Sequence, residues 1–269
     1  MNTKYFYKIK EILVLGLILI SSVMISSLST FYILNRHQNI FIRSIIFSLL
    51  IILSGKFILK VDYNEIKIDL KTIKYNIFDN IYFALIISFL SAALSTIVYQ
   101  AEFIIAKDKA ITINNILSSS TQVSTDNMGL LYIFSVVLVI FIEELFFRFL
   151  TFKYIVKDES NKKDIYLFIF GSSILFMLYH GYSIARMVSV FILSISYCLI
   201  YIKTKNFIFP LIMHILWDFF IFILSPLLSL FKSYNLSVMT ATAALNTIFF
   251  LIALIIIYIV SKIKSKSIW

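Results

Sequence analysis

The sequence has few of the residues that interrupt helices. It contains two prolines and five glycines among 269 residues. Because proline and glycine break or weaken a helix, their scarcity permits long helices. It also argues against a transporter, whose membrane helices are often broken at mid-span. Cysteine occurs once, as Cys198, which excludes a disulfide within one chain.

Charged residues are scarce as well. They make up 14% of the chain, whereas hydrophobic residues make up 61%, and the mean hydropathy is +0.96. A soluble domain is about a quarter charged. Several apolar runs approach the roughly 20 residues that cross a bilayer as a helix, and the short alternating strands of an outer-membrane barrel are absent. The sequence therefore predicts an all-α polytopic membrane helical bundle.

The apolar runs predict about eight transmembrane helices. Pro210 falls in the first turn of the seventh, where a missing N–H is tolerated, and Pro226 is expected to close that helix. The mixed-charge segment 60–76 fits either a short hairpin or an interfacial helix. The expected spans are about Ile12–Leu34, Ser44–Leu59, Ile81–Ile104, Met128–Val156, Ile165–Tyr182, Ala185–Ile202, Phe207–Leu224 and Thr240–Val260.

The net charge of +10 resides mainly in the connecting loops and the termini. Most lysine and arginine lies in alternate loops together with the two terminal segments. Since basic loops remain in the cytoplasm, both termini are predicted to be cytoplasmic, and the charge does not indicate nucleic-acid binding. The richness in Ile, Lys, Asn and Tyr suggests an AT-rich coding sequence, so we expect the plasma membrane of a low-GC bacterium.

Three ionisable residues lie close together within the fourth predicted span. An acid or arginine at the centre of a membrane helix costs roughly 2.5–3.5 kcal/mol, so Glu143, Glu144 and Arg148 are expected to have a use. Glu144 and Arg148 are four residues apart and therefore share a helix face, which predicts an ion pair. Glu143 is rotated by about 100° and has no partner in its own helix, as suits a base.

Two of the three histidines lie in other predicted spans. Phe176 and His180 are four residues apart in the fifth span, and His214 and Asp218 are four apart in the seventh. With a rise of about 1.5 Å per residue, His180 and His214 lie at a depth similar to that of Glu143. The sequence therefore predicts that these helices contribute to one site inside the membrane.

Three motifs resemble those of a known family. They read EExxxR at Glu143–Arg148, FxxxH at Phe176–His180 and HxxxD at His214–Asp218. In this order they resemble the CPBP family, the CAAX-protease and bacteriocin-processing (Abi) intramembrane peptidases related to the type II CAAX prenyl endopeptidase. The resemblance covers about residues 128–225. It divides the chain into N-terminal helices (1–127), a peptidase core (128–225), and a C-terminal helix with a basic tail (226–269).

The resemblance implies hydrolysis of a peptide bond within the membrane. By analogy with the family, Glu143 and His180 activate a water molecule, and His214 with Asp218 stabilises the oxyanion. An ionised Asp218 only accepts hydrogen bonds. Either Asp218 is protonated and donates to the oxyanion, or it holds the His214 ring while His214 alone donates, and we favour the second. The supporting residues implied are Glu144, Arg148 and Phe176.

A metal is the alternative to a glutamate mechanism. Glu143, His180 and His214 form a set that would suit zinc with an open position, although the chain has no HExxH spacing. We favour the mechanism without a cofactor. The expected partners are membrane lipid and a membrane-associated peptide, such as a bacteriocin or pheromone precursor. The rival function is a catalytically silent bacteriocin-immunity or scaffold protein, against which the intact glutamate and histidines argue.

Overall fold

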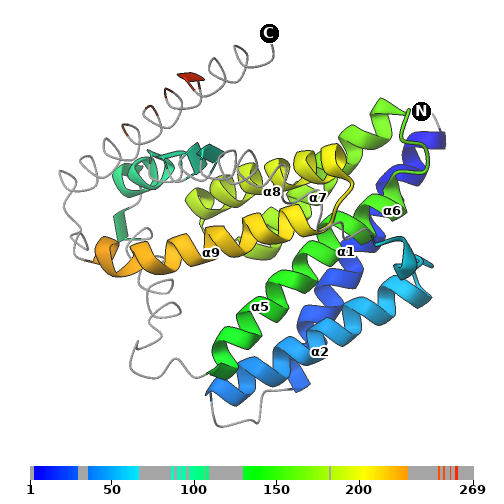
Figure 1. Cartoon of the computed structure of the whole chain (residues 1–269), viewed down its shortest axis with the longest axis horizontal. Coiled ribbons are helices and arrows are strands. Elements are labelled where there is room, and N and C mark those ends of the chain that lie inside the picture. The colour runs from blue at the N-terminus through cyan, green and yellow to red at the C-terminus, as the bar shows by residue number, and fades with distance from the viewer. Residues whose placement is uncertain are drawn as a thin grey trace. The chain divides into compact units, whose positions relative to one another are not determined.

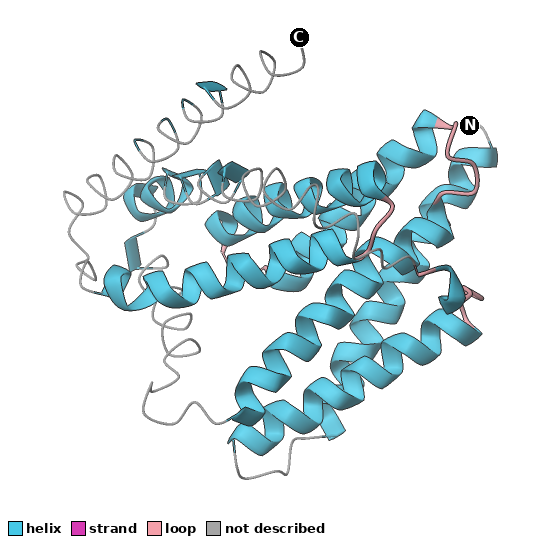
Figure 2. Cartoon of the chain, in the orientation of Figure 1, coloured by secondary structure: helices cyan, strands magenta, loops and turns pink. Residues whose placement is uncertain are grey.

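The described part of the chain is helical, and no strand occurs in it (Figure 2). The computed structural model describes residues 3–29, 36–66, 130–181 and 183–229, with shorter stretches within 86–108 and 248–259. The α-helices are α1 (Thr3–Ser29), α2 (Arg36–Phe57), α5 (Leu130–Glu144), α6 (Thr151–Ile155), α7 (Lys162–His180), α8 (Ile184–Thr204) and α9 (Ile208–Ser229). A 3-10 turn, η1 (Tyr63–Glu65), and a π-helical segment, η3 (Leu145–Leu150), complete the set.

The chain divides into two compact units. The first comprises Met1–Asp69, Val123–Leu175 and Tyr197–Ile215, and the second comprises Leu70–Gln122, Phe176–Ser196 and Leu216–Trp269. Helices α7, α8 and α9 each begin in one unit and end in the other. Each unit is described separately below.

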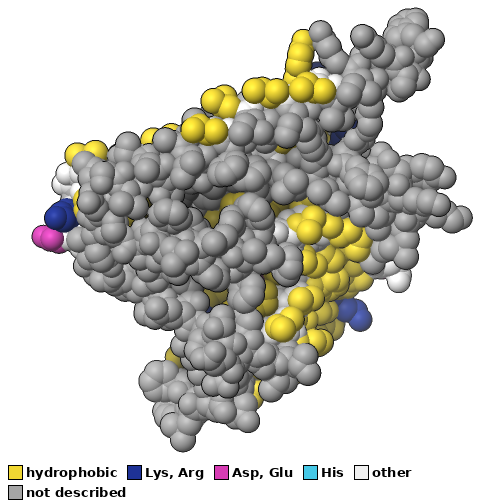
Figure 3. Space-filling view, turned by 60° about the vertical axis from the view of Figure 1, so that its left-hand side comes forward, with side chains coloured by type: hydrophobic (Ala, Val, Ile, Leu, Met, Phe, Trp, Pro, Cys, Tyr) yellow, Lys and Arg dark blue, Asp and Glu magenta, His cyan; other side chains and the backbone are white. Residues whose placement is uncertain are grey.

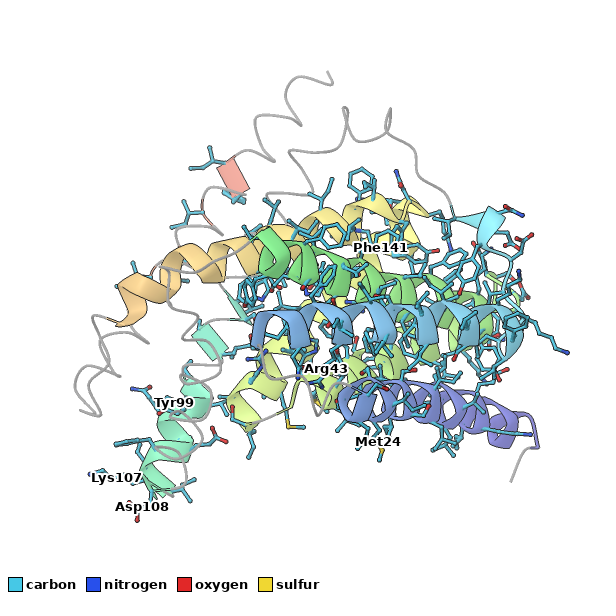
Figure 4. The ribbon with its side chains drawn as sticks, turned by 90° about the horizontal axis from the view of Figure 1, so that it is seen from below. Met24, Arg43, Tyr99, Lys107, Asp108 and Phe141 are labelled. Carbon is cyan, nitrogen blue, oxygen red and sulfur yellow. The ribbon has the colours of Figure 1, made fainter. Side chains whose placement is uncertain are left out.

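In the first unit, α1, α2 and α5 lie side by side, with α2 in contact with both of the others (Figure 1). Leu15 on α1 and Ile51 on α2 are fully buried between the helices. The outward faces are apolar too: Leu17 is 66% exposed, and Met24 is 57% exposed and points away from the helices in Figure 4. A helix that is apolar all round suits a lipid environment. Exposed hydrophobic side chains are prominent on the described surface in Figure 3.

Three described helices are long and apolar enough to cross a membrane, judged by length and composition. They are Ile9–Ser29, Asn39–Phe57 and Ile184–Thr204, and Ile208–Asp218 is a shorter apolar helix. These helices support the prediction of a membrane protein built from helices. Most of the predicted eighth span at Thr240–Val260 and part of the third at Ile81–Ile104 lie outside the described residues.

The predicted end of the seventh span is wrong. Pro226 lies within α9, which continues to Ser229. A proline removes one backbone donor and crowds the carbonyl four residues earlier, but membrane helices tolerate this where neighbouring groups satisfy the freed backbone. The fourth predicted span, in contrast, coincides with the continuous run of α5, η3 and α6.

The π-helical segment lies in the middle of that run. The backbone N–H of Thr151 is directed at the carbonyl of Phe146, five residues earlier, and the Thr151 hydroxyl donates to the same oxygen at 2.8 Å. Every side chain from Leu145 to Leu150 is buried. π-helical turns are rare and often occur at functional sites. The charged residues in and beside this segment are therefore candidates for a functional site.

The residues that follow α2 pack against the π-helical segment. Tyr63 of η1 donates a hydrogen bond to the Ile52 carbonyl at 2.7 Å, and its ring stacks on that of Phe149 at 6.3 Å. Gly55 leaves the space for this approach, since a Cβ there would lie 2.0 Å from the Tyr63 hydroxyl. Partial burial raises the pKa of Tyr63 to about 12. The described part of segment 60–76 is thus a 3-10 turn, and residues 67–76 lie outside the description.

In the second unit, Glu102 caps the start of α8. Its carboxylate accepts a hydrogen bond from the Ile184 backbone N–H at 3.1 Å. An acid at this position also compensates the positive end of the helix dipole. Further along α8, Ser91 donates to the Ser189 carbonyl at 3.0 Å, and both side chains are buried. These contacts fix the start of the helix that carries Tyr197 further along.

Candidate active site

Glu143 and Glu144 are the last two residues of α5, and Arg148 lies in η3 directly after them. Their side chains are 4%, 0% and 0% exposed, respectively. The predicted ion pair is present, because Arg148 Nε lies 3.1 Å from Glu144 Oε2. Both side chains are fully buried, so the ion pair stabilises the fold, since either charge alone would be strongly destabilising.

His214 of α9 joins this pair from a distant part of the sequence. Its Nδ1 lies 2.7 Å from Glu144 Oε1 and its Nε2 lies 3.7 Å from Glu143 Oε2. Glu144 therefore bridges Arg148 and His214, with one oxygen directed at each. Because a carboxylate accepts, His214 must carry a proton on Nδ1. Its Nε2 is directed towards Glu143, so the two edges of the ring face the two glutamates.

Tyr197 of α8 is the site residue that the sequence did not reveal. Its ring is 2% exposed. The ring centroid lies 5.5 Å from that of His214, with 33° between the planes. The guanidinium carbon of Arg148 lies 5.2 Å from the same centroid. A tyrosine inside an apolar run is usually a core residue, and no charged neighbour in the sequence distinguishes this one.

The surroundings of the cluster hold the π-helical segment in place. The Ser172 hydroxyl of α7 donates to the Phe147 carbonyl at 2.6 Å, and both residues are buried. The ring of Phe141, labelled in Figure 4, meets that of Phe207 edge to face at 5.5 Å. This contact joins α5 to the residue before α9, so it fixes the helix that carries the glutamates relative to the start of the helix that carries His214.

His180 and Asp218 belong to the second unit. His180 is the last residue of α7, and its Nδ1 lies 3.1 Å from the Phe176 carbonyl one turn earlier. When Nδ1 carries the proton and donates to this oxygen, Nε2 is left as an acceptor. The rings of Phe176 and His180 are 4.4 Å apart, so the FxxxH spacing has a structural role within the helix.

The structure thus brings Glu143, Glu144, Arg148 and His214 together within the first unit. Asp218 follows His214 on α9 by one turn and is partly buried. The prediction that Asp218 holds the His214 ring stays a prediction. The observed partner of Nδ1 is Glu144, which lies 70 residues away in the sequence.

The side chains include the types that zinc prefers, namely imidazole and carboxylate. His214 Nε2 and Glu143 Oε2 face each other and offer two donor atoms. Within the described ranges, no three His, Cys, Asp or Glu side chains are grouped as a metal site. Of the three zinc ligands proposed from the sequence, the first unit therefore contains two, Glu143 and His214.

The fold and the cluster define a helical membrane protein with a buried Glu–Glu–Arg–His site. Residues 125–220 match the family model described as type II CAAX prenyl endopeptidase Rce1-like. This segment, which contains every residue of the cluster, is therefore similar to the Rce1-like family. Comparison with curated proteins and with solved structures gave no match.

Proposed function

We propose that this protein is an intramembrane endopeptidase that uses a glutamate to activate water. The observation that supports this most directly is the buried Glu143 carboxylate facing His214 Nε2 at 3.7 Å, within a segment that matches an endopeptidase family. Burial removes Glu143 from bulk water, and Glu144 is already engaged by Arg148 and His214. We therefore assign Glu143 as the carboxylate that accepts a proton from a substrate water.

In the proposed reaction, Glu143 takes a proton from water while the water oxygen attacks the peptide carbonyl carbon. The carbonyl oxygen becomes an oxyanion, and protonated His214 donates to it from Nε2 while Nδ1–H remains bonded to Glu144. The C–N bond then breaks, and the proton on Glu143 passes to the leaving amine. Before the reaction, Glu143 and Glu144 carry two negative charges, which balance the positive charges of Arg148 and protonated His214.

The motif resemblance assigns His180 to the activation of the water with Glu143. Its Nδ1 contact with the Phe176 carbonyl supports this role, because it fixes the ring and, with the proton on Nδ1, makes Nε2 the acceptor nitrogen. Phe176 thus serves as the support for His180. The assignment rests on the order of the three motifs and on this local contact.

Asp218→Asn is expected to keep the rate of peptide cleavage or to raise it. Asparagine preserves the shape of Asp218, and it adds a donor and removes a negative charge near a developing oxyanion. The measurement is kcat of the variant with the same peptide as the wild type. A loss of more than about tenfold, or roughly 1.4 kcal/mol, would show that the ionised carboxylate is required.

We favour a mechanism without a metal, and this has a direct test. The purified protein is expected to contain zinc well below one equivalent, and a chelator such as 1,10-phenanthroline should leave cleavage unchanged. Elemental analysis and the chelated assay measure the two quantities. Stoichiometric zinc, with activity lost on chelation and restored by zinc, would instead assign Glu143, His180 and His214 as ligands, with the metal supplying Lewis-acid activation of water.

The proposed membrane topology, location and substrate class rest on the sequence. We propose eight membrane spans with both termini in the cytoplasm, in the plasma membrane of a low-GC bacterium. The proposed substrate is a membrane-associated peptide or protein, such as a bacteriocin or pheromone precursor, met within the lipid. No nucleic-acid partner is proposed.

The test uses purified protein in lipid vesicles that contain defined peptides. The probes are a farnesylated peptide ending in a CAAX sequence, as the family description suggests, and a set of synthetic single-span peptides. Mass spectrometry is expected to detect a matched pair of internal fragments from at least one probe. If the wild type and a Glu143→Ala variant protect cells from a bacteriocin equally well, the protein acts as a silent immunity protein instead.

A further inference from the structure

Tyr197 contacts two members of the cluster at once. Its ring centroid lies 5.5 Å from that of His214 and 5.2 Å from the guanidinium carbon of Arg148. These two residues flank Glu144, which contacts both of them. Tyr197 and Glu144 therefore both link the same arginine and histidine.

The two links restrict different movements. Glu144 contacts His214 at the ring edge through Nδ1, and a ring held at one edge can still turn about that contact. The Tyr197 ring is tilted by 33° from the imidazole plane, with the two centroids 5.5 Å apart, so it packs against the imidazole and opposes that rotation. Arg148 gains a cation–π contact with the same ring, which opposes its movement away from Glu144.

We propose that Tyr197 is a positioning residue for the hydrolysis, and that its ring keeps Nε2 of His214 directed towards the reacting carbonyl. This inference rests on the proposed peptidase function. It assigns a role to α8, for which none of the three sequence motifs gives one. The aromatic ring carries the role, so phenylalanine should replace tyrosine.

Tyr201 provides a matched control on the same helix. It lies one turn beyond Tyr197 and is 5% exposed. Its ring packs against Phe152 at 5.4 Å and Phe168 at 6.5 Å. Replacing either tyrosine with leucine removes a similar buried ring, but only Tyr197 contacts His214. A purely structural role would give the two variants the same phenotype.

The first test measures kcat and KM in lipid vesicles. Tyr197→Leu should lower kcat by about 10- to 100-fold, because a donor displaced by about 1 Å loses much of its effect. KM should stay within about twofold, as expected when only transition-state contacts are lost. Tyr197→Phe should keep kcat within about threefold of the wild type, and Tyr201→Leu should keep it within the same range. The proposal is overturned if Tyr197→Leu retains the wild-type kcat, or if phenylalanine fails to rescue.

A second test needs no activity. It compares the melting temperatures of Tyr197→Leu, His214→Gln and the double variant, where glutamine keeps a donor for Glu144. We expect coupling: the effect of Tyr197→Leu should fall by at least about half when the His214 ring is already absent. The Tyr201→Leu effect should be unaltered. Additive effects for Tyr197 and His214 overturn the positioning role, whatever the activity. Coupling without any cleavage by the wild type overturns the peptidase function, and with it this role.

Discussion

Replacing Glu143 with glutamine is expected to lower kcat by about 10³-fold, which is within the range attributed to a general base. Glutamine has nearly the same shape, and its amide oxygen cannot take the proton of the attacking water. Glu143 is 4% exposed, so no bulk water is at hand to take over its role. The measurement is the initial rate of fragment formation in lipid vesicles, with the melting temperature recorded to establish that the variant is folded.

The matched control for Glu143→Gln is Glu159→Gln. Glu159 belongs to the same unit and pairs with Lys205 at 2.9 Å, but it is 61% exposed. Its replacement should change kcat by less than about twofold, since exposed ion pairs contribute little. If Glu143→Gln kept more than a tenth of the wild-type rate, another group would have to be the base.

The second large effect concerns stability. Arg148→Met should lower the free energy of unfolding by roughly 3–5 kcal/mol, because it leaves the fully buried Glu144 carboxylate without its cation. His214 still contacts the other oxygen of Glu144, so the loss should fall near the lower end of this range. Unfolding in detergent, followed by circular dichroism, measures the change.

Removing both charges tests the reason for that loss. The double variant Glu144→Gln/Arg148→Met should be more stable than Arg148→Met alone, because no uncompensated charge remains. Lys153→Met is the control: Lys153 pairs with Glu65 at a half-exposed site, and its loss should cost less than about 1 kcal/mol. Equal destabilisation by Lys153→Met and Arg148→Met would contradict a buried pair.

The sequence predicted the features that depend on local spacing. Long apolar runs predicted the helices, because few prolines or glycines interrupt them. The interval of four residues predicted the Glu144–Arg148 pair, which the structure contains. The π-helical segment was missed, because it differs from an α-helix in its hydrogen-bond register and no residue type specifies it.

Contacts between distant segments were harder to predict. Spacing suggested Asp218 as a partner of the His214 ring, which stays a prediction, and gave no sign of Glu144, on another helix, which lies at Nδ1. Such a partner is set by helix packing, which depends on many side chains at once. Tyr197 was missed for the same reason: an aromatic residue in an apolar run looks like an ordinary core residue until the neighbouring helix is placed.

The most direct test of the proposed function is cleavage in water enriched in oxygen-18. The purified protein in lipid vesicles is given the farnesylated CAAX peptide and the single-span peptides, and the fragments are analysed by mass spectrometry. Hydrolysis by a Glu143-activated water predicts one heavy oxygen in the newly formed C-terminal carboxylate with the wild type, and fragment formation about 10³-fold slower with Glu143→Gln. Fragments that Glu143→Gln produces as fast as the wild type, or a wild type that leaves every probe intact, would contradict it.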